Sequence, residues 1–343
     1  MNYILKPLLV LQFLVLITSC GDQDKKDAAD FFLKGNVALG QKNYAEALRL
    51  YDEAIAKNAD FSDAYLNKGI SLSKLNRHQE AYDVLTEALR IDPTLVQANL
   101  ARAEIALDLG KKQETRVDLA QIAKEYKDSA RYYLVRGNLA VADGNDTQAI
   151  SEYDRTLQLD KRNVEAYVNR GAIYYKMNNL NYAETDFRSA LVLDRAQPQA
   201  LNNLGLIASK KKDWDEANSF FDQVLSKNPA DPVAMNNKGY VLLQTGHPAD
   251  ALALIQRSLD ILPENPYALR NLGMYYDQKG QSAEAIQSYQ KAIDLAEPVE
   301  MLYGLAGDAY LRAGNKSQAC TIWKQGAILK DSLAIEMLTA NCN

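Results

Sequence analysis

The sequence predicts an all-α chain built from tandem pairs of antiparallel helices. Within residues 266–299 small and apolar side chains fall on one face of a helix, at Leu269, Leu272, Gly273 and Tyr276. A second helix shows the same spacing, at Ala285, Tyr289 and Ala292. Gly280 ends the first helix because glycine accepts the left-handed backbone of a helix C-terminus. Gly273 and Ala285 lack bulk, so the two helices can approach closely.

This two-helix pattern recurs every 34 residues without an insertion or deletion. A small residue of the first helix recurs at Gly35, Gly69, Ala103, Gly137, Gly171, Gly205, Gly239, Gly273 and Gly307. A small residue of the second helix recurs at Ala47, Ala81, Thr115, Ala149, Ala183, Ala217, Ala251, Ala285 and Ala319. We therefore predict nine tandem repeats over residues 28–333, in which each repeat packs only on its neighbours.

The pattern L-x₂-L-G-x₂-Y followed by A-x₃-Y, with a period of 34, resembles the tetratricopeptide repeat (TPR) family. The resemblance implies an α-solenoid, a right-handed superhelix whose concave face is lined by the first helix of each pair. The third repeat, residues 96–129, departs from the pattern. It has Ala103 for glycine, Thr115 for alanine and Ile122 at another alanine position, so we expect altered helix spacing there.

The N-terminus resembles a bacterial lipoprotein leader. Lys6 precedes an apolar run at residues 8–17 that is too short to span a bilayer, and Ile-Thr-Ser-Cys follows. The resemblance implies a signal peptide at 1–19, a lipid on Cys20 and a polar, flexible tether at 20–27. An ordinary signal peptide with a coincidental cysteine is the alternative. We expect anchoring in the bacterial cell envelope at the outer membrane, on its periplasmic or surface face.

The C-terminal residues 334–343 are predicted to form a capping helix or tail over the last repeat. Such a helix folds back around a turn near residue 331, which brings Cys320 and Cys342 level with each other. Because disulfides persist in exported proteins, we predict a bond between these two cysteines. Two free buried thiols are the alternative.

Composition and motifs argue against several functions. The chain has 343 residues, a net charge of −5 and a pI near 5.3, which disfavours nucleic acid as a partner. The two histidines, His78 and His247, fall in predicted turns, and no metal-spaced cluster or phosphate-binding loop is present. We predict no cofactor, no metal and no catalytic residue.

The predicted binding surface lies on the first helices of repeats five to eight. Asparagine recurs at one position, as Asn169, Asn203, Asn237 and Asn271. The row resembles the asparagine ladder of O-GlcNAc transferases, which implies a grip on the main chain of an extended peptide. Asparagine is also common at this position in TPR sequences, so a structural role is the alternative. Specificity is predicted to come from neighbours on the same stripe, namely Tyr240, Tyr267, Arg270 and Met274.

The sequence thus predicts a non-catalytic scaffold or adaptor that binds peptide segments of protein partners. A structural assembly subunit of an outer-membrane, pilus or cell-wall complex is the first alternative. An enzyme or regulator in glycan metabolism is an alternative of another class.

Overall fold

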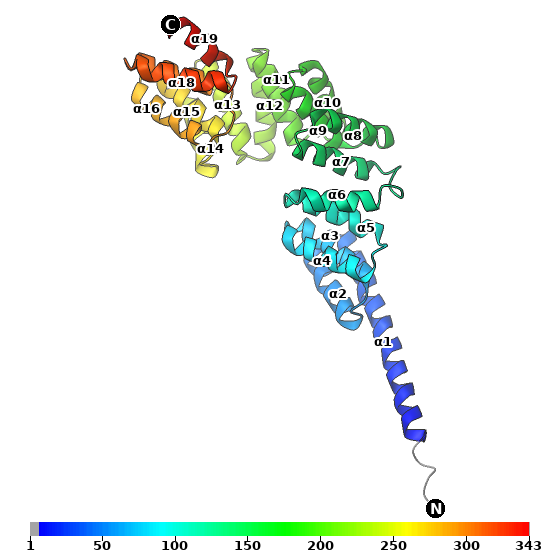
Figure 1. Cartoon of the computed structure of the whole chain (residues 1–343). Helices are drawn as coiled ribbons and strands as arrows, with labels where there is room; N and C mark the ends of the chain where they lie inside the picture. The colour runs from blue at the N-terminus through cyan, green and yellow to red at the C-terminus, as the bar shows by residue number, and fades with distance from the viewer. Residues whose placement is uncertain (1–6, 343) are drawn as a thin grey trace, which may run out of the picture. The chain divides into compact units, whose positions relative to one another are not determined.

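The structure is a computed structural model that describes residues 7–342, with side chains from residue 23 onward. Over these residues the chain forms nineteen helices and no strand, and it divides into unit 1 (Met1–Ala166) and unit 2 (Tyr167–Asn343) (Figure 1). The helices α1 to α8 are Pro7–Gly40, Tyr44–Lys57, Ser62–Lys74, His78–Ile91, Val96–Asp108, Lys112–Gln121, Ala130–Ala142 and Asp146–Leu159. Helix α9, Val164–Lys176, crosses the division.

The remaining helices belong to unit 2. Helices α10 to α14 are Leu180–Leu193, Pro198–Lys210, Trp214–Lys227, Pro232–Gln244 and Pro248–Ile261. Helices α15 to α19 are Pro266–Gln278, Ser282–Asp294, Leu302–Arg312, Lys316–Ile328 and Ser332–Asn341. From α2 onward, the second helix of each pair begins 34 residues after the previous one, and the first helices from α3 to α15 keep the same period. The helix boundaries therefore follow the period that the sequence predicts.

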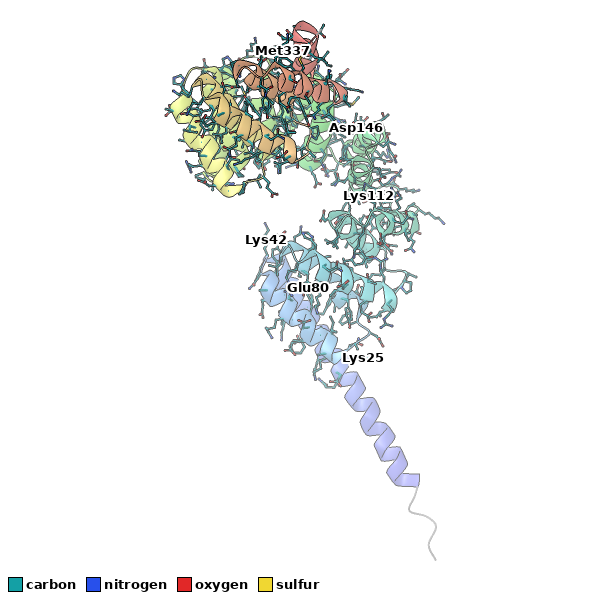
Figure 2. All side chains as sticks on the ribbon, turned by 60° about the vertical axis from the view of Figure 1, so that its left-hand side comes forward. Lys25, Lys42, Glu80, Lys112, Asp146 and Met337 are labelled. Carbon is teal, nitrogen blue, oxygen red and sulfur yellow. A yellow bond between two sulfur atoms is a disulfide. The ribbon has the colours of Figure 1, made fainter. Side chains whose placement is uncertain are left out.

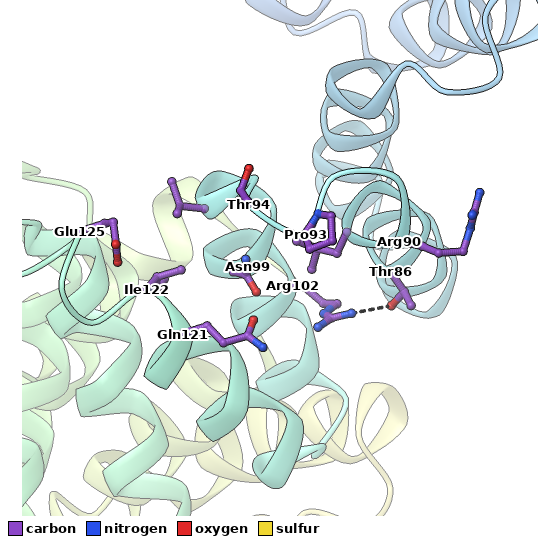
Figure 3. Close-up of a pocket in the computed structure, with 11 residues that line it drawn as sticks. Thr86, Arg90, Pro93, Thr94, Asn99, Arg102, Gln121, Ile122 and Glu125 are labelled. Atoms are coloured by element: carbon purple, nitrogen blue, oxygen red, sulfur yellow. Dashed lines mark hydrogen bonds between the residues drawn. The ribbon is translucent and has the colours of Figure 1, made fainter.

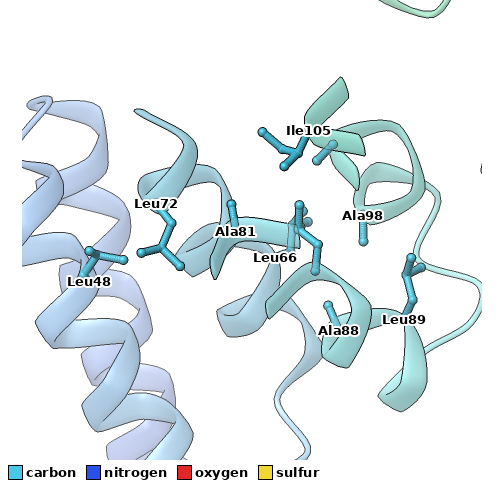
Figure 4. Close-up of a cluster of buried hydrophobic side chains, with 10 residues drawn as sticks. Leu48, Leu66, Leu72, Ala81, Ala88, Leu89, Ala98 and Ile105 are labelled. Carbon is cyan, nitrogen blue, oxygen red and sulfur yellow. The ribbon is translucent and has the colours of Figure 1, made fainter. Parts of the chain in front are cut away.

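Missing side-chain bulk allows the close helix pairing. A Cβ atom at Gly273 would lie 2.4 Å from the ring of Tyr289, which is fully buried beneath it. Bulky side chains from the neighbouring helices fill the remaining space. Figure 4 shows this in unit 1, where Leu66, Leu72 and Ile105 converge in one buried cluster. Each pair thus buries its apolar face against its own partner helix and the next pair.

The third predicted repeat is irregular. Its second helix, α6, ends at Gln121 after 10 residues, whereas α4 and α8 have 14 residues each. Ile122 is fully buried just beyond this end, at the position that Ala54 and Ala88 occupy in the two preceding repeats. Residues 122–128 form turns where α4 and α8 have a last helical turn. The Thr115 hydroxyl is satisfied by the carbonyls of Ala103 and Lys111, at 3.2 and 3.1 Å.

We expect this repeat to be the least stable internal unit, because a weak unit of a one-dimensional stack opens without unfolding distant neighbours. Backbone amides of residues 96–129 should exchange with solvent faster than those of residues 164–197. Hydrogen–deuterium exchange with peptide-level resolution checks this. Equal or slower exchange in residues 96–129 would contradict it.

The segment predicted as a flexible tether, residues 20–27, is part of α1 in the structure. Side-chain contacts explain why its end is ordered: Lys57 of α2 donates to Asp24 at 3.1 Å and lies 4.0 Å from Asp27. Figure 2 shows Lys25 near the point where α1 leaves the other helices of unit 1. In the described part of the chain no helix is long and apolar enough to cross a membrane. The side chain of Cys20 and residues 1–6 lie outside what the structure describes.

The C-terminal helix α19 begins at Ser332, two residues before the predicted boundary, and packs on α17 and α18. Asp331 caps it by accepting from the backbone N–H of Ala334 at 3.1 Å, and its other oxygen accepts from Tyr303 N at 3.0 Å. Cys320 and Cys342 are joined by a disulfide, with their Cα atoms 5.8 Å apart. The fold-back of α19 on α18 thus brings the two cysteines level.

Candidate functional site

Asn271 does not face an open groove, which corrects the predicted ladder at this position. Its side chain is fully buried. The amide nitrogen donates to Oδ1 of Asn236 at 2.8 Å, and the amide oxygen accepts from Nε and Nη2 of Arg270 at 3.1 and 2.9 Å. Both ends of the amide are therefore engaged within the protein. Sequence spacing places asparagine on the inner stripe, but it does not show that Asn236 of α13 and the adjacent Arg270 engage its amide.

The other three asparagines of the row are partly buried. Asn203 donates to the carbonyl of Gln199 in its own helix at 2.9 Å. Asn237 accepts from Asn236 at 3.5 Å, and its amide nitrogen is buried without a hydrogen-bond partner. Asn169 also has a partner within the protein. Asn203 and Asn271 therefore fit the structural alternative that the sequence left open.

We expect Asn271→Ala to lower stability, because it leaves the buried Asn236 oxygen without its donor. An unsatisfied buried polar group of this kind costs about 1–3 kcal/mol. Asn203→Ala is the matched control, since it removes the same side chain from the same position of another helix and breaks only a bond to its own helix. Thermal unfolding followed by circular dichroism compares the two variants. Equal melting temperatures would show that Asn271 is not a structural residue.

Three of the predicted specificity residues, Tyr240, Tyr267 and Arg270, do come together. The Arg270 guanidinium lies 5.6 Å from the ring centre of Tyr240 and 5.8 Å from that of Tyr267. Both distances are within the range of cation–π attraction. Tyr267 is 44% exposed, so the cluster reaches solvent. We call these three residues the Tyr–Arg cluster; it lies on α13 and α15.

Two residues from earlier helices of unit 2 extend this surface. Lys210 of α11 places its ammonium 5.1 Å from the ring centre of Tyr175, which lies on α9. Burial, with the nearby Glu300 carboxylate as the next contributor, raises the pKa of Tyr175 to about 12. Burial also lowers the pKa of Arg270 and raises that of Tyr240, because a low-dielectric environment disfavours charge. Tyr175 and Lys210 were not among the predicted binding residues, although the same 34-residue stepping places both on the inner stripe.

Met274, the fourth predicted specificity residue, packs against buried clusters that include Tyr289 and Ile255. Met274 is partly buried and contributes to packing between helix pairs, which its flexible side chain suits. Of the two histidines predicted to lie in turns, His247 does precede α14 as its N-cap residue, whereas His78 is the first residue of α4. Among the described residues, no group of His, Cys, Asp and Glu is placed to hold a metal ion.

Unit 1 carries a surface cleft of about 710 Å³ that the sequence did not predict (Figure 3). It opens between α4 and the turns that replace the end of α6, and its walls include Pro93 and Ile122. Asn99 lines it with a side chain that is 2% exposed, and the Asn99 amide oxygen has no hydrogen-bond partner. The cleft therefore lies beside the shortened end of α6, with Gln121 and Ile122 in its wall.

Family profiles match most of the solenoid. Profiles described as "Tetratricopeptide repeat" match residues 32–95, 168–234 and 231–297, and one described as "TPR repeat" matches residues 137–178. The chain belongs to the tetratricopeptide repeat family. The TPR fold also extends beyond these matches. A crystal structure of the APC/C hetero-tetramer Cut9-Hcn1 superposes on 92% of this chain and 76% of that chain, with a TM-score of 0.64 and 14% identity.

Two curated relatives show how far this similarity reaches. The Photosystem I assembly protein Ycf3 of Acaryochloris marina is 29% identical over 135 residues, which is 38% of this TPR chain and 81% of the relative. A UDP-N-acetylglucosamine–peptide N-acetylglucosaminyltransferase of Giardia intestinalis is 28% identical over 108 residues. That match covers 32% of this chain but only 7% of the transferase. TPR domains act as protein-binding scaffolds, and these matches share that repeat architecture.

Proposed function

We propose that this TPR protein is a non-catalytic scaffold that binds an extended segment of a protein partner at the Tyr–Arg cluster of unit 2. The observation that carries the proposal is the half-buried guanidinium of Arg270 between two tyrosine rings, one of which is 44% exposed. Tyrosine and arginine are the residue types most enriched at interface hot spots. Lys210 and Tyr175 widen the same surface over two further helices.

We further propose that the scaffold is anchored by lipid to the bacterial cell envelope, at the outer membrane. The Ile-Thr-Ser-Cys sequence that ends at Cys20 supports this proposal, and so does the short apolar run before it. The bonded Cys320 and Cys342 are consistent with an oxidising compartment.

A structural subunit that helps to assemble one envelope complex is the second candidate. The matched assembly protein Ycf3 favours it, since 81% of that relative aligns with this chain. A role in glycan metabolism has weaker support, because the matched part is only 7% of the transferase.

Site-specific photocrosslinking in native envelopes tests the scaffold proposal. A photoreactive tyrosine analogue replaces Tyr267 in one variant and Tyr182, which is 66% exposed on α10, in the control. We expect the analogue at Tyr267 to capture partner protein that the one at Tyr182 does not. Capture of one protein in stoichiometric amounts supports the assembly candidate, and capture of many supports a general adaptor. The same weak background from both positions would refute the proposed surface.

The anchor is tested by Cys20→Ala. We expect the variant to move from the membrane fraction to the soluble fraction, because lipid attachment requires the cysteine sulfur. Ser19→Ala is the matched control, since a small residue before the cysteine is retained and fractionation should not change. Immunoblots of salt-washed membranes give the measurement. A Cys20→Ala protein that stays in the washed membranes would contradict the lipid anchor.

A further inference from the structure

The connection between α16 and α17 runs over the proposed binding surface. This connection, residues 295–301, contacts the surface through its backbone and through Glu300. Arg270 Nη1 donates to the carbonyl of Glu300 at 3.0 Å, and Tyr267 Oη donates to the carbonyl of Pro298 at 3.4 Å. The Glu300 carboxylate lies 3.6 Å from the ammonium of Lys210 on α11. Side chains of two helices thus hold main-chain carbonyls and one carboxylate of an irregular segment.

The connection departs from the regular pattern in both length and geometry. Between α12 and α13, and between α14 and α15, the chain uses four residues, whereas here it uses seven. Helix α17 begins at Leu302, two residues later than the 34-residue period predicts. Met301 at its N-cap has a left-handed φ of 63° and no side-chain capping bond. Left-handed backbone at a non-glycine residue is unfavourable and persists only where the surroundings impose it.

Charge explains what holds the segment in place. Lys210 and Arg270 supply two cations, and Tyr175, Tyr240 and Tyr267 surround them. Glu300 is the acidic side chain paired with this group, and its side chain is 66% exposed. Such an exposed ion pair is weak, so an incoming carboxylate can compete for Lys210. Val299, by contrast, is buried, so the middle of the connection stays attached to the core.

We propose that Glu300 and its neighbours are a built-in competitor for the binding surface, and that the partner segment is extended and acidic. The proposal rests on the function proposed above. An acidic residue of the partner takes the place of Glu300 at Lys210, and a partner carbonyl replaces that of Glu300 at Arg270. The partner therefore binds only after the connection has moved off these two side chains. The apparent affinity for the partner is then reduced in proportion to the fraction of molecules in this open state.

The test uses the full chain and a fluorescent peptide, Ac-AEPVEM-amide, with the sequence of residues 296–301. Its affinity is measured by fluorescence anisotropy for the wild type and for Glu300→Gln. We expect the variant to bind about two- to fivefold more tightly, the range set by the loss of one exposed ion pair. Glu297→Gln is the matched control, since it removes an exposed acid from the same connection, and it should bind like the wild type. A peptide with glutamine at both acidic positions should bind both proteins more weakly than the acidic peptide does.

Equal affinities for the wild type and Glu300→Gln, or weaker binding by the variant, would overturn the competitor role. Equal binding of the acidic and the glutamine peptide would overturn the acidic partner class. Neither result affects crosslinking from Tyr267, so the proposed function is judged separately. Hydrogen exchange of residues 296–301 gives a second measurement on the wild type. Saturating peptide should speed exchange there, and unchanged or slower exchange would contradict displacement.

Discussion

Replacing Arg102 with methionine should destabilise unit 1 by about 3–5 kcal/mol, the usual cost of removing one partner of a buried ion pair. Asp118 on α6 is fully buried, and the Arg102 guanidinium of α5 binds its two oxygens through Nε and Nη2 at 2.9 and 2.6 Å. Without Arg102, the Asp118 carboxylate has no charged partner in an apolar environment. Chemical denaturation followed by far-UV circular dichroism measures the loss of unfolding free energy. Hydrogen exchange over residues 96–129 shows whether this repeat is the part that loses stability.

Two control variants distinguish the effect of breaking the ion pair from any general effect of removing an arginine side chain. The double variant Arg102→Met/Asp118→Leu should recover most of the stability, because well-packed apolar residues can replace a buried ion pair at little cost. Arg49→Met removes an arginine whose pair with Glu46 is solvent-exposed, so it should leave the unfolding transition nearly unchanged. A single Arg102→Met variant as stable as wild type would show that Asp118 does not depend on its partner.

The ion pair recurs along the solenoid, and the sequence contains a signal for it that was overlooked. Arg170 binds Asp186 at 2.6 Å, and Arg136 binds Glu152 at the same distance. Each pair, like Arg102 with Asp118, joins residues 16 apart, one on the first helix and one on the second. The 34-residue stepping aligns the three arginines at one position and the three acids at another. Comparing charges between the two helices of each repeat would have predicted these contacts.

Helix positions and small packing residues were predictable because they depend on local spacing that recurs in every repeat. Gly273 shows this, since the ring of Tyr289 occupies the space its absent Cβ leaves. The location of the irregular repeat was also predictable, from Ile122, although the shortened α6 and the cleft beside it were not. A departure from the repeat pattern can be read from the sequence, but the path that the chain takes there depends on the neighbouring helices.

The binding surface was harder to predict because it depends on contacts between distant repeats. Asn271 lies on the expected face, yet Asn236 and Arg270 enclose it. Glu300 belongs to a connection that the repeat pattern treats as a simple turn, but it reaches Lys210 three helix pairs earlier in the chain. The position of a residue within a repeat predicts the helix face on which its side chain lies. Its contacts depend on how successive helix pairs stack.

The double variant Cys320→Ser/Cys342→Ser should lose about 3 kcal/mol of stability, the value that the chain-entropy model gives for a loop of this length. The two cysteines are 22 residues apart, and their disulfide joins α18 to the residue that follows α19. Helix α19 covers Gly304 and Gly326, where added Cβ atoms would meet Leu333 and Ala334. Loosening α19 therefore uncovers the end of the solenoid, where Trp323 is buried.

Thermal unfolding with and without a reducing agent measures this contribution. The wild type should melt at a lower temperature when reduced, while the double variant should not respond to reductant, which controls for other effects of the reagent. Hydrogen exchange in residues 332–341 should rise in the reduced wild type before it rises in α15, because each pair of a solenoid contacts only its neighbours. Equal melting temperatures for oxidised and reduced wild type would mean that the packing of α19 alone holds the end closed. Thiol titration of protein taken from its native compartment completes the test, since free Cys320 and Cys342 there would contradict the oxidising envelope location proposed for the chain.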